Sequence, residues 1–111
     1  MATEHDDQKA VVSWLRKFYP HLVIAAIPNG EQRSKTTGVK LKAEGVLAGI
    51  PDLIIAMPNG GSIWVEMKTK SGKLSTVQKE VHSRLEYLGH TVIIGYGAND
   101  AIKQLADIFK L

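Results

Sequence analysis

Two acidic residues and a lysine lie where they could share one site: Asp52, Glu66 and Lys68. Glu66 and Lys68 fall in a predicted strand over 62–70, and side chains two residues apart in a strand project from the same face, about 7 Å apart. Asp52 stands at the start of the preceding apolar run. Whether it lies level with Glu66 depends on the register of the hairpin, which the sequence leaves open.

This combination of residue types favours a metal ion. Two carboxylates held close together repel each other, and a hard divalent cation such as Mg²⁺ or Mn²⁺ removes that repulsion. Such a cation lowers the pKa of a bound water and neutralises charge on a phosphodiester. Lys68 could position the attacking water or stabilise the charged transition state. Each residue alone also has a structural alternative, because a Glu and a Lys on one strand face are commonly a solvated ion pair and an Asp after Pro is commonly a turn residue.

The elements that would position these residues alternate along the chain. Apolar periodicity, helix caps and glycine or proline turns predict helices over 4–19, 34–44, 75–88 and 100–110. Strands are predicted over 22–27, 53–57, 62–70 and 91–96. The order α-β-α-β-β-α-β-α predicts a single α/β domain over 1–111, with a mixed sheet of about four strands and helices on both faces.

The apolar stripes of the helices predict which faces are buried. The first helix, capped by Thr3 with Asp6 as a variant capping box, has the stripe Val11, Val12, Leu15 and Phe18. Continued backwards, that stripe places Gln8 and Glu4 on the inward face. The third helix, capped by Ser75, has the stripe Val77, Val81, Leu85 and Leu88.

The remaining patterns concern the strands, the second helix and the histidines. Five successive apolar residues over 53–57 predict a central strand that is covered on both faces. Ser34 is expected to cap the second helix, and Gly45 to end it. The four histidines, which have no close ligand spacing, are interpreted as surface residues: His5, His21, His82 and His90.

Bulk properties narrow the class of protein. A chain of 111 residues without cysteine has no disulfide framework, thiolate metal site or cysteine nucleophile. Its polar N-terminus is unlike a signal peptide, and no apolar run approaches the roughly 20 residues that span a bilayer. We therefore expect a soluble cytoplasmic protein with no membrane partner. The net charge of +3 and pI near 9.2 lean towards an anionic partner.

The motifs resemble those of a known nuclease family. Pro51-Asp52 followed by Glu66-Met67-Lys68 is similar to the signature of the PD-(D/E)xK nuclease superfamily. Three flanking stretches, 27–30, 43–53 and 72–78, resemble the VRR-NUC family of virus-type replication-repair nucleases. The resemblance extends over about residues 4–96 with the motifs in order, and it implies a restriction-endonuclease-like core.

The resemblance also implies roles for individual residues. Asp52, Glu66 and the backbone carbonyl of Met67 would bind the metal, and Lys68 would be the catalytic lysine. Glu4 would lie in the outer shell of the metal or bind it directly, although an acid in a first helical turn is favoured by the helix dipole anyway.

The third helix and the second turn of the first helix supply two further candidates. By the same resemblance, Gln78 would order the site or contact the phosphate, and its alternative is a plain surface residue. Gln8 is a weaker candidate, because only its inward phase points to the site.

Several basic side chains flank these motifs in the sequence. Such side chains would hold the phosphate backbone of DNA without reading its bases, and their binding would depend strongly on salt, although charged helix faces are commonly just solvated. The candidates for DNA binding are Arg33, Lys35, Lys40, Lys42, Lys70 and Lys73.

The function implied is a Mg²⁺- or Mn²⁺-dependent, structure-specific DNA endonuclease that hydrolyses phosphodiester bonds in branched or four-way-junction (Holliday junction) DNA, as in DNA repair. By family analogy it would act as a homodimer, in a phage or bacterial setting. One alternative is a DNA-binding module that recognises structure without cleaving. Another is an RNA nuclease, because metal-assisted hydrolysis does not itself distinguish the sugar.

Overall fold

The structure is a computed structural model that describes residues 3–28 and 35–110, with the backbone alone at 35–38. Four helices and four strands alternate in the predicted order, with a short 3₁₀ turn in the hairpin. They are α1 (Glu4–Phe18), β1 (Val23–Ala26), α2 (Lys35–Ala43), β2 (Leu53–Ala56), η1 (Pro58–Gly60), β3 (Ser62–Lys68), α3 (Thr76–Tyr87), β4 (Thr91–Tyr96) and α4 (Ala98–Phe109). The predicted Ser34 cap lies outside the described residues.

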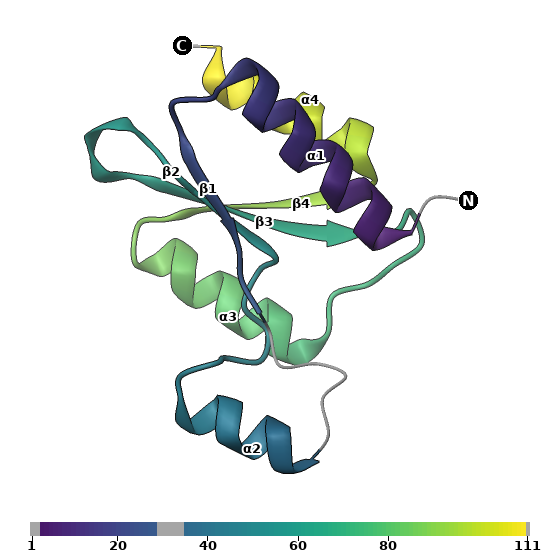
Figure 1. Cartoon of the computed structure of the whole chain (residues 1–111), viewed down its shortest axis with the longest axis vertical. Coiled ribbons are helices and arrows are strands. Elements are labelled where there is room, and N and C mark those ends of the chain that lie inside the picture. Colours follow the sequence, from purple (N-terminus) through teal and green to yellow (C-terminus); the bar gives the residue numbers. More distant parts are fainter. Residues whose placement is uncertain (1–2, 29–34, 111) are drawn as a thin grey trace.

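The strands form one mixed sheet in the order β1-β2-β3-β4. The pairs β1–β2 and β2–β3 are antiparallel, whereas β3 and β4 run parallel, with α3 as the crossover between them. Figure 1 shows α1 and α4 together on one side of the sheet, α3 on the other, and α2 beyond α3 at one end of the molecule. The predicted α/β architecture is therefore confirmed, and β2 is central as expected. Its burial, however, alternates along the strand instead of being uniform.

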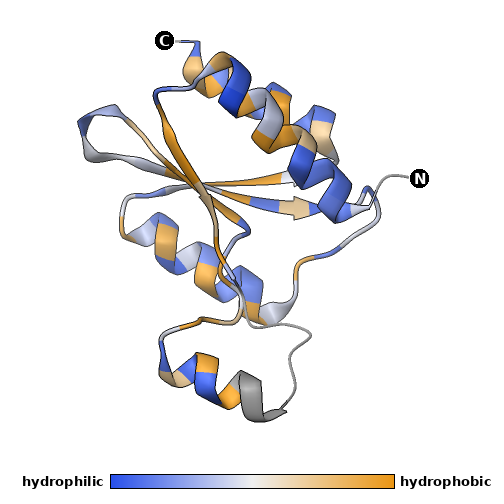
Figure 2. Cartoon of the chain, in the orientation of Figure 1, coloured by the Kyte–Doolittle hydropathy of each residue, from blue (hydrophilic) through white to orange (hydrophobic). Residues whose placement is uncertain are grey.

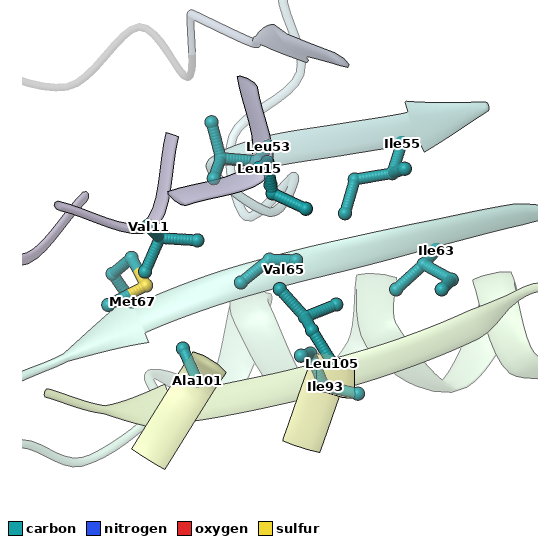
Figure 3. Close-up of a cluster of buried hydrophobic side chains, with 10 residues drawn as sticks. All are labelled: Val11, Leu15, Leu53, Ile55, Ile63, Val65, Met67, Ile93, Ala101 and Leu105. Carbon is teal, nitrogen blue, oxygen red and sulfur yellow. The ribbon is translucent and has the colours of Figure 1, made fainter. Parts of the chain in front are cut away.

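The main hydrophobic core lies between the sheet and the pair α1–α4 (Figures 2 and 3). Alternate residues of β3 enter it, so Ile63, Val65 and Met67 are almost fully buried. The side chains between them project from the opposite face, which α3 covers. The core residues are Val11, Leu15, Leu53, Ile55, Ile63, Val65, Met67, Ile93, Ala101 and Leu105.

An aromatic cluster closes one end of this layer. Trp14 of α1 stacks on Phe109 of α4 with ring centroids 6.4 Å apart, and Tyr19 packs on Phe109 at 4.5 Å. The prediction that Phe18 belongs to the buried stripe is wrong, because this side chain is 58% exposed. It leans on Trp14 at the rim, in the last turn of α1, instead of entering the core.

A local sequence signal accounts for the start of α1. Thr3 and Asp6 form the expected capping box, in which each side chain accepts a hydrogen bond from the backbone of the other.

Within residues 3–28 and 35–110, no helix combines the length and apolar character needed to cross a membrane.

The close approach of α4 to β4 depends on Gly95. A β-carbon at this position would lie 2.5 Å from Cβ of Ala101, so we expect Gly95→Ala to lower the free energy of unfolding by about 1–3 kcal/mol. Urea denaturation followed by circular dichroism measures this loss. The matched control is Gly61→Ala, whose added carbon would meet only Cβ of Met57 at 3.9 Å. Equal stability of Gly95→Ala and the wild type would contradict this packing.

Candidate active site

The antiparallel register of β2 and β3 places Asp52 beside Glu66. Leu53 pairs with Val65, so the next step along the same register sets Asp52 level with Glu66. Paired residues share a face of the sheet, and Leu53 and Val65 lie on the core face. The two carboxylates therefore lie on the opposite face, the one covered by α3. The structure thus supplies the register that the sequence left open.

A hydrogen bond fixes the Asp52 carboxylate at the end of the hairpin. The backbone N–H of Met67 donates to Oδ2 of Asp52 over 2.7 Å. In an extended strand the N–H and C=O of one residue point to the same side. The Met67 carbonyl is therefore directed to the side on which Asp52 lies, as a metal ligand at that position would require.

The ionisation of Asp52 is strongly perturbed. The pKa of its carboxyl is raised from 3.8 to about 7, mainly by burial and also by the charge of Glu66 and a hydrogen bond with that side chain. The hydrogen bond from Met67 and the charge of Lys68 oppose this rise. Two acids in contact at a partly desolvated place repel each other more strongly than the nearby charge of Lys68 offsets, so the site favours a further positive charge.

Lys68 lies on the same face of β3, as strand alternation predicts. Its side chain is half-buried and passes close to the turn that follows the strand. A β-carbon at Gly72 would lie 3.4 Å from Cδ of Lys68 and 3.2 Å from the carbonyl oxygen of Thr69. The absence of a side chain at Gly72 therefore leaves room for the lysine stem beside the two acids.

The buried face of α3 differs from the predicted one. Val81 is buried and Leu85 half-buried, as expected, but Val77 is 47% and Leu88 is 68% exposed. The helix is rotated so that Gln78 and His82 face the sheet, at 7% and 5% exposure. Each of these two polar residues has a hydrogen-bond partner in the protein, which offsets the cost of burying it.

His82 is the site residue that the sequence interpretation missed. Its Nε2 lies 3.1 Å from Oε1 of Glu66, and the exposed fraction of Glu66 is only 2%. Treating this histidine as a surface residue is therefore wrong. The signal that could have identified it is its spacing, one helical turn after Gln78 and directly after the buried Val81.

His90 is also half-buried, contrary to prediction, whereas His5 and His21 are exposed as expected. Its Nδ1 lies 2.6 Å from Oγ of Ser62, which in turn accepts a hydrogen bond from Nε1 of Trp64 over 3.0 Å. This cluster joins the beginning of β3 to the beginning of β4, at the opposite end of β3 from Lys68.

The side chain of Gln78 takes part in the cap at the beginning of α3. Its Oε1 accepts a hydrogen bond from the backbone N–H of Ser75, whose Oγ accepts one from the N–H of Gln78. This capping box fixes where α3 begins and therefore which residues face the sheet.

The capping box can be tested by Ser75→Ala. Removing the hydroxyl leaves a helix N–H without its acceptor, so we expect the free energy of unfolding to fall by about 1 kcal/mol. Chemical denaturation measures the change. Ser83→Ala, on the exposed side of the same helix, is the control and should change stability by less than about 0.5 kcal/mol. A loss no larger than that of the control would argue against the cap.

The segment that leads into Asp52 packs against the beginning of α3. Gly49 is buried with a φ of +87°, and an added β-carbon would lie 2.8 Å from both Cγ1 and the carbonyl oxygen of Val77. Only glycine combines this backbone conformation with such a close approach. The contact ties the position of Asp52 to the same helix that carries His82.

The other predicted residues are exposed, half-buried or outside the described ranges. Glu4, in the first turn of α1, is exposed, whereas Gln8, one turn further along the same stripe, is half-buried. Four of the basic residues predicted to bind DNA are exposed: Lys40 and Lys42 on α2, and Lys70 and Lys73 after β3. Arg33 and the side chain of Lys35 fall outside the described parts of the chain.

The donor set fits a hard divalent cation. In the described ranges, no group of three or more His, Asp or Glu side chains could hold a metal by protein ligands of that kind alone. Mg²⁺, however, is usually bound by one or two carboxylates and keeps several waters. Asp52, Glu66 and the Met67 carbonyl therefore form a suitable partial set, and a cation would remove the repulsion that raises the pKa of Asp52.

Comparisons with known proteins agree with this description. The model of the VRR-NUC domain family matches residues 2–99. "Putative nuclease p44" of Acyrthosiphon pisum secondary endosymbiont phage 1 is 46% identical over 46 residues, which are 41% of this chain and 50% of that protein. The match thus spans about half the length of this curated relative.

Two solved structures have the same fold. One, described as a VRR_NUC domain protein, superposes with a TM-score of 0.82 at 25% identity and covers 100% of this chain and 91% of its own. The other, described as a VRR_NUC domain, gives a TM-score of 0.67 at 20% identity, with coverages of 97% and 99%. The arrangement of helices around the mixed sheet is therefore shared along nearly the whole chain.

Proposed function

Since the chain belongs to the VRR-NUC family of nuclease domains, we propose that it is a Mg²⁺- or Mn²⁺-dependent endonuclease that hydrolyses phosphodiester bonds in DNA. The observation that carries the proposal is the contact between Asp52 and Glu66 beside the N–H of Met67, with Lys68 on the same face. A protein that only bound DNA would gain nothing from two repelling carboxylates facing a polyanion.

The chain's own groups divide the chemical work. Asp52, Glu66 and the carbonyl of Met67 would hold the cation, which when bound supplies charge neutralisation at the phosphate and a lower pKa for water. Lys68 places a positive charge next to the carboxylates, where its ammonium can donate hydrogen bonds to a phosphate oxygen or orient the attacking water. The capping box and Gly49 hold the surrounding backbone in place.

The finer part of the proposal concerns the substrate. We propose branched DNA, including four-way junctions, cut by a two-fold homodimer. The described residues of one chain form one such site, and symmetric cleavage of two strands is most simply achieved by two identical sites related by a dyad. Exposed lysines such as Lys70 and Lys73, in the segment that follows β3, would hold the phosphate backbone of the DNA without reading its bases.

A cleavage panel tests both levels of the proposal. Linear duplex, flap, splayed arm and four-way junction are each incubated with Mg²⁺, with Mn²⁺ and with EDTA, and a matched RNA hairpin is included. We expect metal-dependent cuts that are fastest on the branched DNAs, and light scattering should give the mass of a dimer. Equal rates on all DNAs would remove the structure specificity. Tight binding without cleavage would favour a recognition module, and cleavage of the RNA alone would favour an RNA nuclease.

A further inference from the structure

The His82–Glu66 contact is a buried hydrogen bond between two side chains. It crosses from α3 to β3, and both side chains are at least nine-tenths buried. In the tautomer that carries its proton on Nε2, the imidazole donates to Oε1 of Glu66. Burying two polar side chains costs desolvation free energy, which an apolar pair of similar size would not. The contact is therefore expected to serve a function.

The geometry shows what the contact controls. A glutamate side chain has three rotatable bonds, and holding it in one conformation costs rotamer entropy. His82 engages one of its oxygens from the α3 side, while the same carboxylate interacts with Asp52, whose pKa it raises. The imidazole itself sits on a helix whose start is fixed by the Ser75–Gln78 capping box. The donor is thus held by a rigid element and acts on a flexible acid.

We propose that His82 is a positioning residue, whose imidazole holds one oxygen of the Glu66 carboxylate so that the other oxygen is presented to a divalent cation beside Asp52. The inference rests on the proposed function in so far as it requires that cation. Hydrogen-bond partners of metal-binding carboxylates typically contribute 10- to 100-fold to metal affinity. His82 would act through Glu66 alone and would not touch the substrate.

The test measures Mn²⁺ binding to the full chain without DNA, by titration calorimetry. His82→Leu removes the donor at similar volume, and we expect its Kd for Mn²⁺ to rise roughly 10- to 100-fold. His82→Gln places an amide N–H near the position of Nε2, and it should restore the Kd to within about threefold of the wild type. His90→Leu is the matched control: it removes another imidazole bonded to β3, far from the acids, and should leave the Kd unchanged.

Cleavage supplies a second measurement. It distinguishes weaker metal binding from a general loss of structure, which would also lower the rate at saturating Mn²⁺. For His82→Leu, the Mn²⁺ concentration at half-maximal cleavage should rise by about the same factor as the Kd. The rate at saturating Mn²⁺ should fall by less than about threefold. If His82→Leu fails to fold, His82→Asn is used, because its amide stays polar but is too short to reach Oε1; it should show the same weakened binding.

The outcomes separate this inference from the nuclease proposal. Mn²⁺ binding within threefold of the wild type by a folded His82→Leu or His82→Asn would overturn the positioning role alone. A wild type that binds Mn²⁺ through Glu66 but cleaves nothing would overturn the nuclease and leave His82 in its role. A wild type that binds no Mn²⁺, with or without DNA, would overturn both.

Discussion

Asp52→Asn is expected to reduce DNA cleavage by about 10³-fold and, at the same time, to stabilise the protein above neutral pH. The amide cannot act as an anionic ligand, and metal stabilisation of a phosphoryl transition state supplies several kcal/mol, at about 1.4 kcal/mol per factor of ten. The stability gain arises because the variant no longer has to ionise a partly buried carboxyl beside Glu66. Single-turnover cleavage and chemical denaturation measure the two effects.

The opposite signs of these effects make the result specific. A substitution that simply damages the fold lowers activity and stability together, whereas removal of a strained functional group separates them. The control is Asp107→Asn on the exposed side of α4, which should change neither quantity. Cleavage at more than a tenth of the wild-type rate by Asp52→Asn would show that Asp52 does not hold the metal.

The second large effect is a pH-dependent loss of stability in the metal-free protein. The pKa of Asp52 is about 7 in the fold and 3.8 unfolded, so between these values the folded chain holds a proton that the unfolded chain has released. Stability from this group is therefore complete below about pH 4, falls as the pH rises, and reaches its minimum above pH 7. Discounted for partial exposure of the carboxyl, the loss is about 2 kcal/mol, or roughly 5–10 °C in Tm.

The difference in the free energy of unfolding between the wild type and Asp52→Asn isolates the contribution of the Asp52 carboxyl from that of all other titratable groups. In EDTA, the two proteins should be equally stable near pH 4, and the variant should be the more stable at pH 8. Excess Mn²⁺ at pH 8 should reverse the order, because a ligand at 100 times its Kd adds about 2.7 kcal/mol to the protein that binds it. A stability difference that is independent of pH, or that has the opposite slope, would contradict the buried ionisation of Asp52.

Half of the site could be predicted from strand geometry alone. Alternation in β3 is strict, because Ile63, Val65 and Met67 must all face the core, and this places Glu66 and Lys68 together on the other face. The position of Asp52 could not be predicted in this way. Its place depends on how two strands pair, and a shift of one residue would have turned it to the other face. Its assignment from sequence therefore relied on the family resemblance.

The phase of α3 was mispredicted for a physical reason. Counting apolar residues favours Val77 and Leu88 as buried, but the buried positions include Gln78, which bonds to the backbone of Ser75, and His82, which bonds to Glu66 on β3. Apolar periodicity carries no information about hydrogen bonds between elements. Sequence rules are expected to fail at functional sites, where a buried polar group is retained for its chemistry.

The two tryptophans lie on opposite faces of the sheet, and this offers a separate spectroscopic report on each layer. Trp14 belongs to the aromatic cluster that joins α1 to α4, whereas Trp64 is on β3, on the face of the acids, and contacts His90. A Trp14→Phe variant would emit from the α3 side alone, and Trp64→Phe from the α1–α4 side alone. Coincident unfolding curves would mean that both layers melt as one cooperative unit. An earlier transition at Trp64 would mean that the face of the sheet covered by α3 can open while the main core stays closed.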